Sequence, residues 1–175
     1  MKNAVQIFCT LGLLLLGPPS ALGAGEFGYQ GWGPRVGASV DPDQIFGGIH
    51  LDFGEIWDHI RFQPNVELGV GDDQVLLALN LEAAYLFPVQ QSWMPYAGGG
   101  LGINFVDFDE SSGPSGDGDD TDVGLNILGG VQRVRSGSPD FLLELKVGLS
   151  DSPDAKFTIG WTFGKPTHPG PAGAR

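Results

Sequence analysis

The chain lacks the residues with which small exported domains are usually held together and with which proteins bind nucleic acid. Its one cysteine, Cys9, lies in an N-terminal segment that we expect to be removed. A mature chain without thiols forms no disulfide and uses no cysteine chemistry. Lys and Arg number 9 against 21 Asp and Glu, a formal net charge of -12. With no basic stripe to neutralise phosphates, we expect no nucleic-acid partner.

Long apolar runs are also scarce. The run at residues 4–17 follows Lys2, leads into the small-residue stretch 18–24, and is shorter than the roughly 20 residues that a spanning helix needs. This order is typical of a secretory signal peptide that is cleaved after Gly23. We therefore predict a cleaved signal at residues 1–23, a folded domain at 24–164 and a disordered tail at 165–175.

In place of long apolar runs, the chain has segments in which apolar and polar residues alternate. The 29 Gly and 13 Pro favour turns over long helices. From Ile60 to Val70 apolar side chains and Pro64 occupy the even positions, and polar residues or Gly the odd ones. Such alternation indicates a strand with one apolar and one polar face. Similar patterns occur at residues 32–40, 45–53, 74–87, 96–106, 123–134, 141–149 and 156–163.

These segments predict the fold. Eight stretches of roughly 9 to 13 residues match the length that a tilted strand needs to cross a bilayer. Breaker clusters separate many of them, for example at 41–43, 71–73 and 152–154. The expected architecture is all-β, an eight-stranded up-and-down antiparallel transmembrane β-barrel. The acidic stretch 107–122 is expected to be a mobile loop.

The composition of the polar faces indicates which side points inward. Alternation alone leaves open a soluble, lipocalin-like ligand-binding barrel with an apolar lumen. However, the polar rows contain many Gly and a balanced set of opposite charges, which suits a crowded lumen better than a soluble exterior. We expect an ion-pair network in the lumen that consists of Arg35, Asp52, Arg61, Glu67, Glu82, Glu144 and Lys146. Four of these residues are expected at similar depth: Arg35, Asp52, Arg61 and Glu82.

The aromatic residues support a membrane setting. If the strands run up and down, all four Trp fall at one end of the barrel. Such clustering is expected where an aromatic girdle meets the lipid–water interface. The predicted interface aromatics are Trp32, Trp57, Trp93, Trp161 and Phe163.

The last strand carries the most specific resemblance. Its sequence, Phe-Thr-Ile-Gly-Trp-Thr-Phe at residues 157–163, alternates and ends in Phe. The pattern from Trp32 to Phe163 resembles the small eight-stranded outer-membrane barrels of Gram-negative bacteria, the group of OmpX and the OmpA transmembrane domain. The resemblance implies location in the cell outer membrane, contact with its lipids and insertion by the barrel assembly machinery. We expect a monomer.

Acidic residues gather in the connections of one end. These connections contain 13 of the 21 acidic residues and no Lys or Arg. Clustered carboxylates can bind Ca²⁺ or Mg²⁺, although a solvated acidic loop is the simpler interpretation. The segment that begins at Asp117 is not an EF-hand loop. If Asp117 is position 1, position 12 is Leu128, where an EF-hand has a bidentate Glu. The candidate ligands are Asp117, Asp119, Asp120 and Asp122.

Catalysis and transport are the other function classes considered. A lipid-modifying outer-membrane hydrolase would need a base such as His50 or His59, and no G-x-S-x-G motif is present. Eight strands leave an interior only just wide enough for its own side chains, which argues against a diffusion pore. We therefore expect a non-enzymatic membrane protein without cofactor, in a structural or surface-interaction role.

Overall fold

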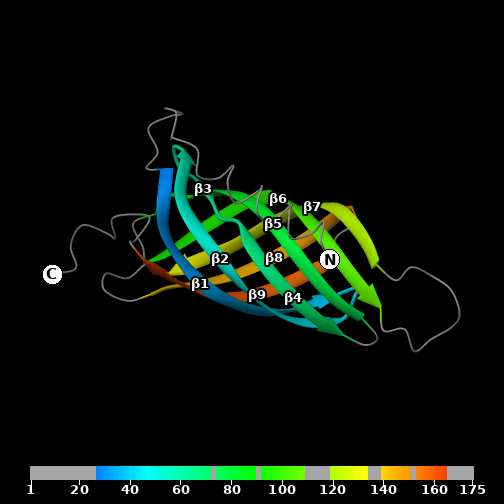
Figure 1. Ribbon diagram of the computed structural model, residues 1–175. Coiled ribbons are helices and arrows are strands. Elements are labelled where there is room, and N and C mark those ends of the chain that lie inside the picture. The colour runs from blue at the N-terminus through cyan, green and yellow to red at the C-terminus, as the bar shows by residue number, and fades with distance from the viewer. Residues whose placement is uncertain are drawn as a thin grey trace, which may run out of the picture.

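The computed structural model describes residues 27–71, 74–89, 92–108, 119–133, 139–150 and 153–164. Within these ranges the regular elements are all strands, as expected from the alternation (Figure 1). None of the described residues belongs to a helix long and apolar enough to cross a membrane. The strands are β1 (Phe27–Val40), β2 (Gln44–Trp57), β3 (Ile60–Phe62), β4 (Asn65–Gly71), β5 (Gln74–Leu86), β6 (Trp93–Phe108), β7 (Asp119–Arg133), β8 (Asp140–Ser150) and β9 (Ala155–Gly164).

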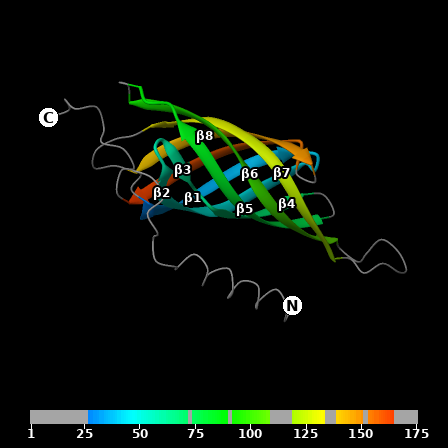
Figure 2. The same cartoon turned by 90° about the horizontal axis from the view of Figure 1, so that it is seen from above.

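The sheet closes into a barrel. Each strand pairs antiparallel with its neighbours, and β1 pairs with both β2 and β9 (Figures 1 and 2). The short β3 and β4 together form one barrel strand, because both pair with β2 on one side and β5 on the other. The interruption falls at Pro64, which has no N–H to donate to the ladder. The prediction of an eight-stranded antiparallel barrel is therefore confirmed.

The barrel has two distinct rims. Gly31 near the start of β1 pairs with Gly164 at the end of β9, so the two ends of the barrel domain lie at one rim, here called the terminal rim. The turn between β2 and β3 lies at this same rim. The opposite rim, here called the acidic rim, contains the turn at residues 41–43 and the facing ends of β6 and β7, where Asp107 pairs with Asp119.

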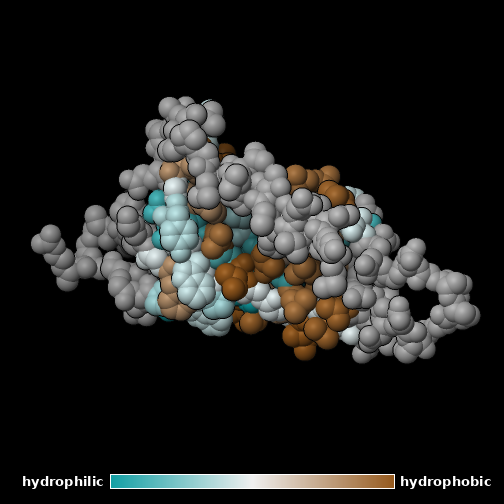
Figure 3. Space-filling view, viewed as in Figure 1, coloured by the Kyte–Doolittle hydropathy of each residue, from teal (hydrophilic) through white to brown (hydrophobic). Residues whose placement is uncertain are grey.

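Apolar side chains face outward and polar side chains inward. Leu68, Leu101 and Leu145 on three different strands are 47–53% exposed, and Figure 3 shows apolar patches on the visible part of the barrel wall. In contrast, 20 polar or charged residues among those described are buried. A soluble barrel with an apolar lumen would have the reverse arrangement.

Two strand boundaries differ from the sequence expectation. A register shift between Phe27 and Gly31 changes the alternation of β1, so that Phe27, Tyr29 and Trp32 are all exposed. At the acidic rim, the expectation of a loop throughout 107–122 is wrong at both ends, because the β6–β7 ladder continues to the Asp107–Asp119 pair. Continuous backbone pairing outweighs the low strand propensity of Asp here. Residues 109–118 lie outside the described part of the chain.

Candidate functional site

The barrel interior is the most strongly charged and most deeply buried part of the described structure. Alternation on every strand directs these side chains into the lumen. Five carboxylates and four cationic groups are buried there, so that opposite charges are almost equal in number, as buried charges require. They are Arg35, Asp52, Arg61, Glu67, Glu82, Asp140, Glu144, Lys146 and Lys156.

Arg35 on β1 is the centre of the larger charge cluster. Its guanidinium lies 2.6 Å from Glu144, 3.3 Å from Glu67 and 3.6 Å from Glu82. These three carboxylates come from β8, β4 and β5, so one cation links four strands. Arg35 itself is fully buried and its partners are at most 3% exposed. The cluster therefore reaches across the barrel interior through ion pairs, of which the one to Glu144 is a charge-assisted hydrogen bond.

Two lysines complete this cluster. The Lys146 ammonium donates to Glu82 and lies 4.0 Å from Glu67, and the Lys156 ammonium donates to Glu67 at 2.8 Å. Lys156 also lies 4.8 Å from the centre of the inward-facing Phe46 ring. The cluster thus contains three cations and three carboxylates.

Arg61 belongs to a different set of contacts. Its guanidinium donates to Gln132, whose amide donates to Asp140 at 3.0 Å, and it lies 4.9 Å from the centre of the Tyr96 ring. The Tyr96 hydroxyl donates to Glu144 at 3.0 Å and so connects this set to the Arg35 cluster. The lumen therefore contains two polar groups of residues joined through Tyr96.

The sequence expectation of four residues at one depth is only partly reproduced. Arg35 and Glu82 do meet. Asp52 instead pairs in register with Gly31, four residues nearer the terminal rim than Arg35, and accepts the Gly54 amide at 2.8 Å. The strands are staggered around a barrel, so side chains that alternate alike along the chain differ in depth.

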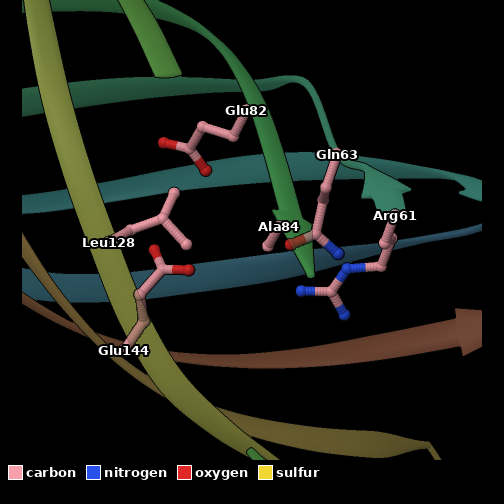
Figure 4. A pocket seen from close by; sticks show the side chains of 6 residues that line it. All are labelled: Arg61, Gln63, Glu82, Ala84, Leu128 and Glu144. Atoms are coloured by element: carbon pink, nitrogen blue, oxygen red, sulfur yellow. The ribbon is translucent and has the colours of Figure 1, made fainter. Parts of the chain in front are cut away.

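The interior leaves little space for a solute. The cavity lined by Arg61, Gln63, Glu82, Ala84, Leu128 and Glu144 measures about 10 Å³, about the room of one water molecule (Figure 4). Towards the terminal rim the lumen is filled by apolar side chains as well. That cluster consists of Ala84, Leu86, Met94, Tyr96 and Leu128.

Inward-facing glycines make room for the large lumenal side chains. A Cβ at Gly130 would lie 2.6 Å from the Tyr96 ring and 2.3 Å from the Leu143 carbonyl oxygen. A Cβ at Gly100 would lie 2.8 Å from Glu82 Cγ. Since carbon atoms do not approach so closely, only glycine fits at these two positions while their neighbours stay in place.

His50, the base considered for a hydrolase, lies inside the barrel. Its Nε2 is 2.8 Å from the Thr162 hydroxyl oxygen, which is the distance expected of a base and a nucleophile. Both side chains are buried in the lumen, His50 completely. A lipid on the outer surface of the barrel therefore has no direct path to this pair.

The predicted interface aromatics gather at the terminal rim. Trp32 and Phe163 are paired in register with ring centres 5.9 Å apart. Phe141 lies 5.6 Å from Trp161 and 6.2 Å from Trp93, and Trp57 ends β2 at the same rim. All of these Trp and Phe163 are 39–57% exposed.

The candidate metal ligands at the acidic rim are only partly described. Asp119, Asp120 and Asp122 belong to β7, where a loop was expected, and Asp117 lies outside the described residues. Among the described residues, potential metal ligands converge at the other end instead. Glu55, Asp58 and His59 place their ligand atoms within 4.8 Å of one another at the β2–β3 turn. This group was not predicted from the sequence, although its Glu-x-x-Asp-His spacing is visible there.

Comparison with known proteins agrees with this architecture. The chain is similar to the crystal structure of Neisserial surface protein A, with 16% identity, a TM-score of 0.62, and coverage of 78% of this chain and 96% of that one. The fold is that of the small eight-stranded outer-membrane barrels. A second similar structure is the N-terminal β-barrel domain of Pseudomonas aeruginosa OprF, with 15% identity, a TM-score of 0.55, and coverage of 78% and 99%. No protein-family model matches the sequence, and the search of curated proteins finds no relative.

Proposed function

We propose that the chain is an integral outer-membrane β-barrel protein that acts as a monomer in a structural or surface-interaction role. The observation that supports this most is the inverted arrangement of its side chains, with nine charged residues buried in the lumen and apolar residues such as Val36, Ile49 and Leu145 about half exposed. An apolar band of this kind is unfavourable in water and favourable in lipid. A closed barrel also satisfies its backbone hydrogen bonds within the sheet, as a bilayer requires.

The proposed route to the membrane follows from the two ends of the chain. Residues 1–23 direct export through the inner membrane and are then removed. The last strand, β9, alternates outward Phe157, Trp161 and Phe163 with inward residues, and resembles the segment that the barrel assembly machinery recognises. Outer-membrane lipids then surround the exposed band.

We propose no catalytic or pore function. The described interior is filled by ion pairs and apolar side chains, and the cavity beside Arg61 has room for about one water molecule. The His50–Thr162 pair faces this closed interior. Both observations favour a barrel that acts through its surface over a lipid hydrolase.

The acidic rim is the proposed interaction surface. Its connections have a high density of carboxylates without a basic residue, so that phosphate-bearing lipid headgroups would be repelled unless divalent cations lie between them. We expect weak binding of Ca²⁺ or Mg²⁺, with dissociation constants nearer about millimolar than micromolar, as for open carboxylate sites. Calorimetry on the folded barrel tests this against a variant with Asn at Asp117, Asp119, Asp120 and Asp122. Identical titrations would leave a solvated acidic rim.

Location and orientation have a direct test. Cell fractionation combined with heat-modifiable gel mobility should find a folded barrel in the outer-membrane fraction. In intact cells, a cysteine at Ser115 in the β6–β7 connection should react with a membrane-impermeant reagent, and one at Ser138 in the β7–β8 connection should not. The opposite labelling pattern would place the acidic rim on the periplasmic side.

A further inference from the structure

The β2–β3 turn on the terminal rim brings three potential metal ligands together. Trp57 pairs with Ile60, so the chain reverses within Asp58 and His59. His59 has a φ of 61°, a left-handed conformation that His, Asn and Asp adopt more readily than other non-glycine residues. The reversal brings Asp58 and His59, at the tip, close to Glu55, which lies two residues before the end of β2.

Two contacts hold the members of this group in place. The His59 backbone N–H donates to Glu55 Oε2 at 2.9 Å, which fixes the carboxylate beneath the turn. The His59 ring meets the Tyr85 ring edge to face, with centres 5.9 Å apart and planes at 75°. A carboxylate has two oxygens and can accept a hydrogen bond while it binds a metal.

The distances suit a shared cation better than a direct hydrogen bond. His59 Nε2 and Asp58 Oδ1 are 3.7 Å apart, which is too long for a hydrogen bond. Two atoms bound at about 2.0–2.1 Å to one tetrahedral zinc ion lie roughly 3.4 Å apart. No two ligand atoms of the three residues are more than 4.8 Å apart. The Asp58 side chain is 71% exposed and able to rotate inward.

The donor set indicates the class of ion. One imidazole nitrogen and two carboxylates form a mixed set that zinc and neighbouring first-row dications bind well. Calcium and magnesium prefer oxygen ligands alone. We propose that Glu55, Asp58 and His59 bind a divalent transition-metal ion such as Zn²⁺ at the terminal rim. This site is separate from the proposed Ca²⁺ or Mg²⁺ binding, which concerns the opposite rim.

The test is a titration of the folded, full-length mature barrel in detergent micelles with zinc chloride, followed by calorimetry. Wild type should bind one equivalent of Zn²⁺. Binding should become at least tenfold weaker in H59N, which retains a residue suited to the left-handed backbone. D58N removes one ligand at the exposed tip and should weaken binding in the same way. D154N, an exposed acidic residue at the opposite rim, serves as the matched control and should titrate like wild type.

A second measurement locates the ion. Copper(II), which quenches nearby indoles, should quench the fluorescence of Trp57, one residue before Asp58, and W57F should lose most of that saturable signal. Heat-modifiable mobility checks folding of every variant, and if H59N fails to fold then D58N decides alone. The proposal is overturned if D58N binds Zn²⁺ as wild type does, or if an excess of Ca²⁺ displaces the Zn²⁺. It is also overturned if binding is lost in the acidic-rim Asn variant alone.

Discussion

Removal of the Arg35 guanidinium should be among the most damaging single changes in the barrel. In R35M the cluster retains three carboxylates and two lysines. Glu144 is affected most. In the described part of the chain its ion pair is with Arg35, at 2.6 Å, and its other carboxylate oxygen accepts the Tyr96 hydroxyl. Loss of one partner from a buried ion pair costs about 3–5 kcal/mol, or roughly a hundredfold to several thousandfold in the unfolding equilibrium.

The same reasoning predicts a rescue. In R35M/E144Q two lysines face Glu67 and Glu82, so charge is balanced again, and the Gln oxygen can still accept the Tyr96 hydroxyl. A buried pair replaced on both sides is often nearly neutral, so the second change should recover at least about 2 kcal/mol. The assay is urea unfolding in lipid vesicles, followed by gel mobility and Trp fluorescence. R133M, which removes a rim guanidinium 5.7 Å from the Trp93 ring centre, is the control. If R35M is as stable as R133M, or E144Q gives no recovery, the charge cluster does not stabilise the barrel.

Two further variant pairs test the packing of the lumen and the outer band. G130A should destabilise the barrel by about 1–3 kcal/mol in the same unfolding assay, because the added Cβ would overlap the Tyr96 ring. G129A is the control. Gly129 faces outward, and an added Cβ would have its nearest neighbouring atom at 3.7 Å, so stability should change little. Equal effects would mean that the lumen yields easily. L101R, at an outward position beside Leu81 and Leu125, should lower the free energy of unfolding in a bilayer by about 2–4 kcal/mol. V40R, at the acidic rim, should lower it by only about 0–1 kcal/mol. Similar small losses in both would indicate that the band does not face lipid.

Alternation was sufficient to predict the strands and their faces. Between Ile60 and Val70 the even positions other than the buried Pro64 point outward, and the inward odd ones include Arg61 and Glu67, as the period of two requires. The same rule identified the buried residues without any knowledge of their partners. The Pro64 interruption, the shift in β1 and the extended β6–β7 ladder departed from it.

The partners themselves could not be predicted in this way. Whether Arg61 meets Glu82 or Gln132 depends on how far neighbouring strands are staggered around the barrel, and that stagger accumulates over several strand pairs. A sequence pattern within one strand contains no information about it. The group of Glu55, Asp58 and His59 was missed for a related reason, because the bend that unites it depends on a left-handed residue that a helix or strand period does not reveal.

The fit of glycines against large side chains on adjacent strands constrains how the barrel interior can change over evolutionary time. Gly100 lies opposite Glu82, and Gly130 opposite Tyr96, so each bulky group occupies the volume that its neighbour leaves empty. A single enlargement is blocked, whereas a paired exchange of large for small between adjacent strands keeps the volume and needs in addition a small shift of the backbone, such as the Leu143 carbonyl beside Gly130. Many different interiors can therefore close the same barrel, in agreement with the low identity of 15–16% between this chain and two solved barrels of the same fold.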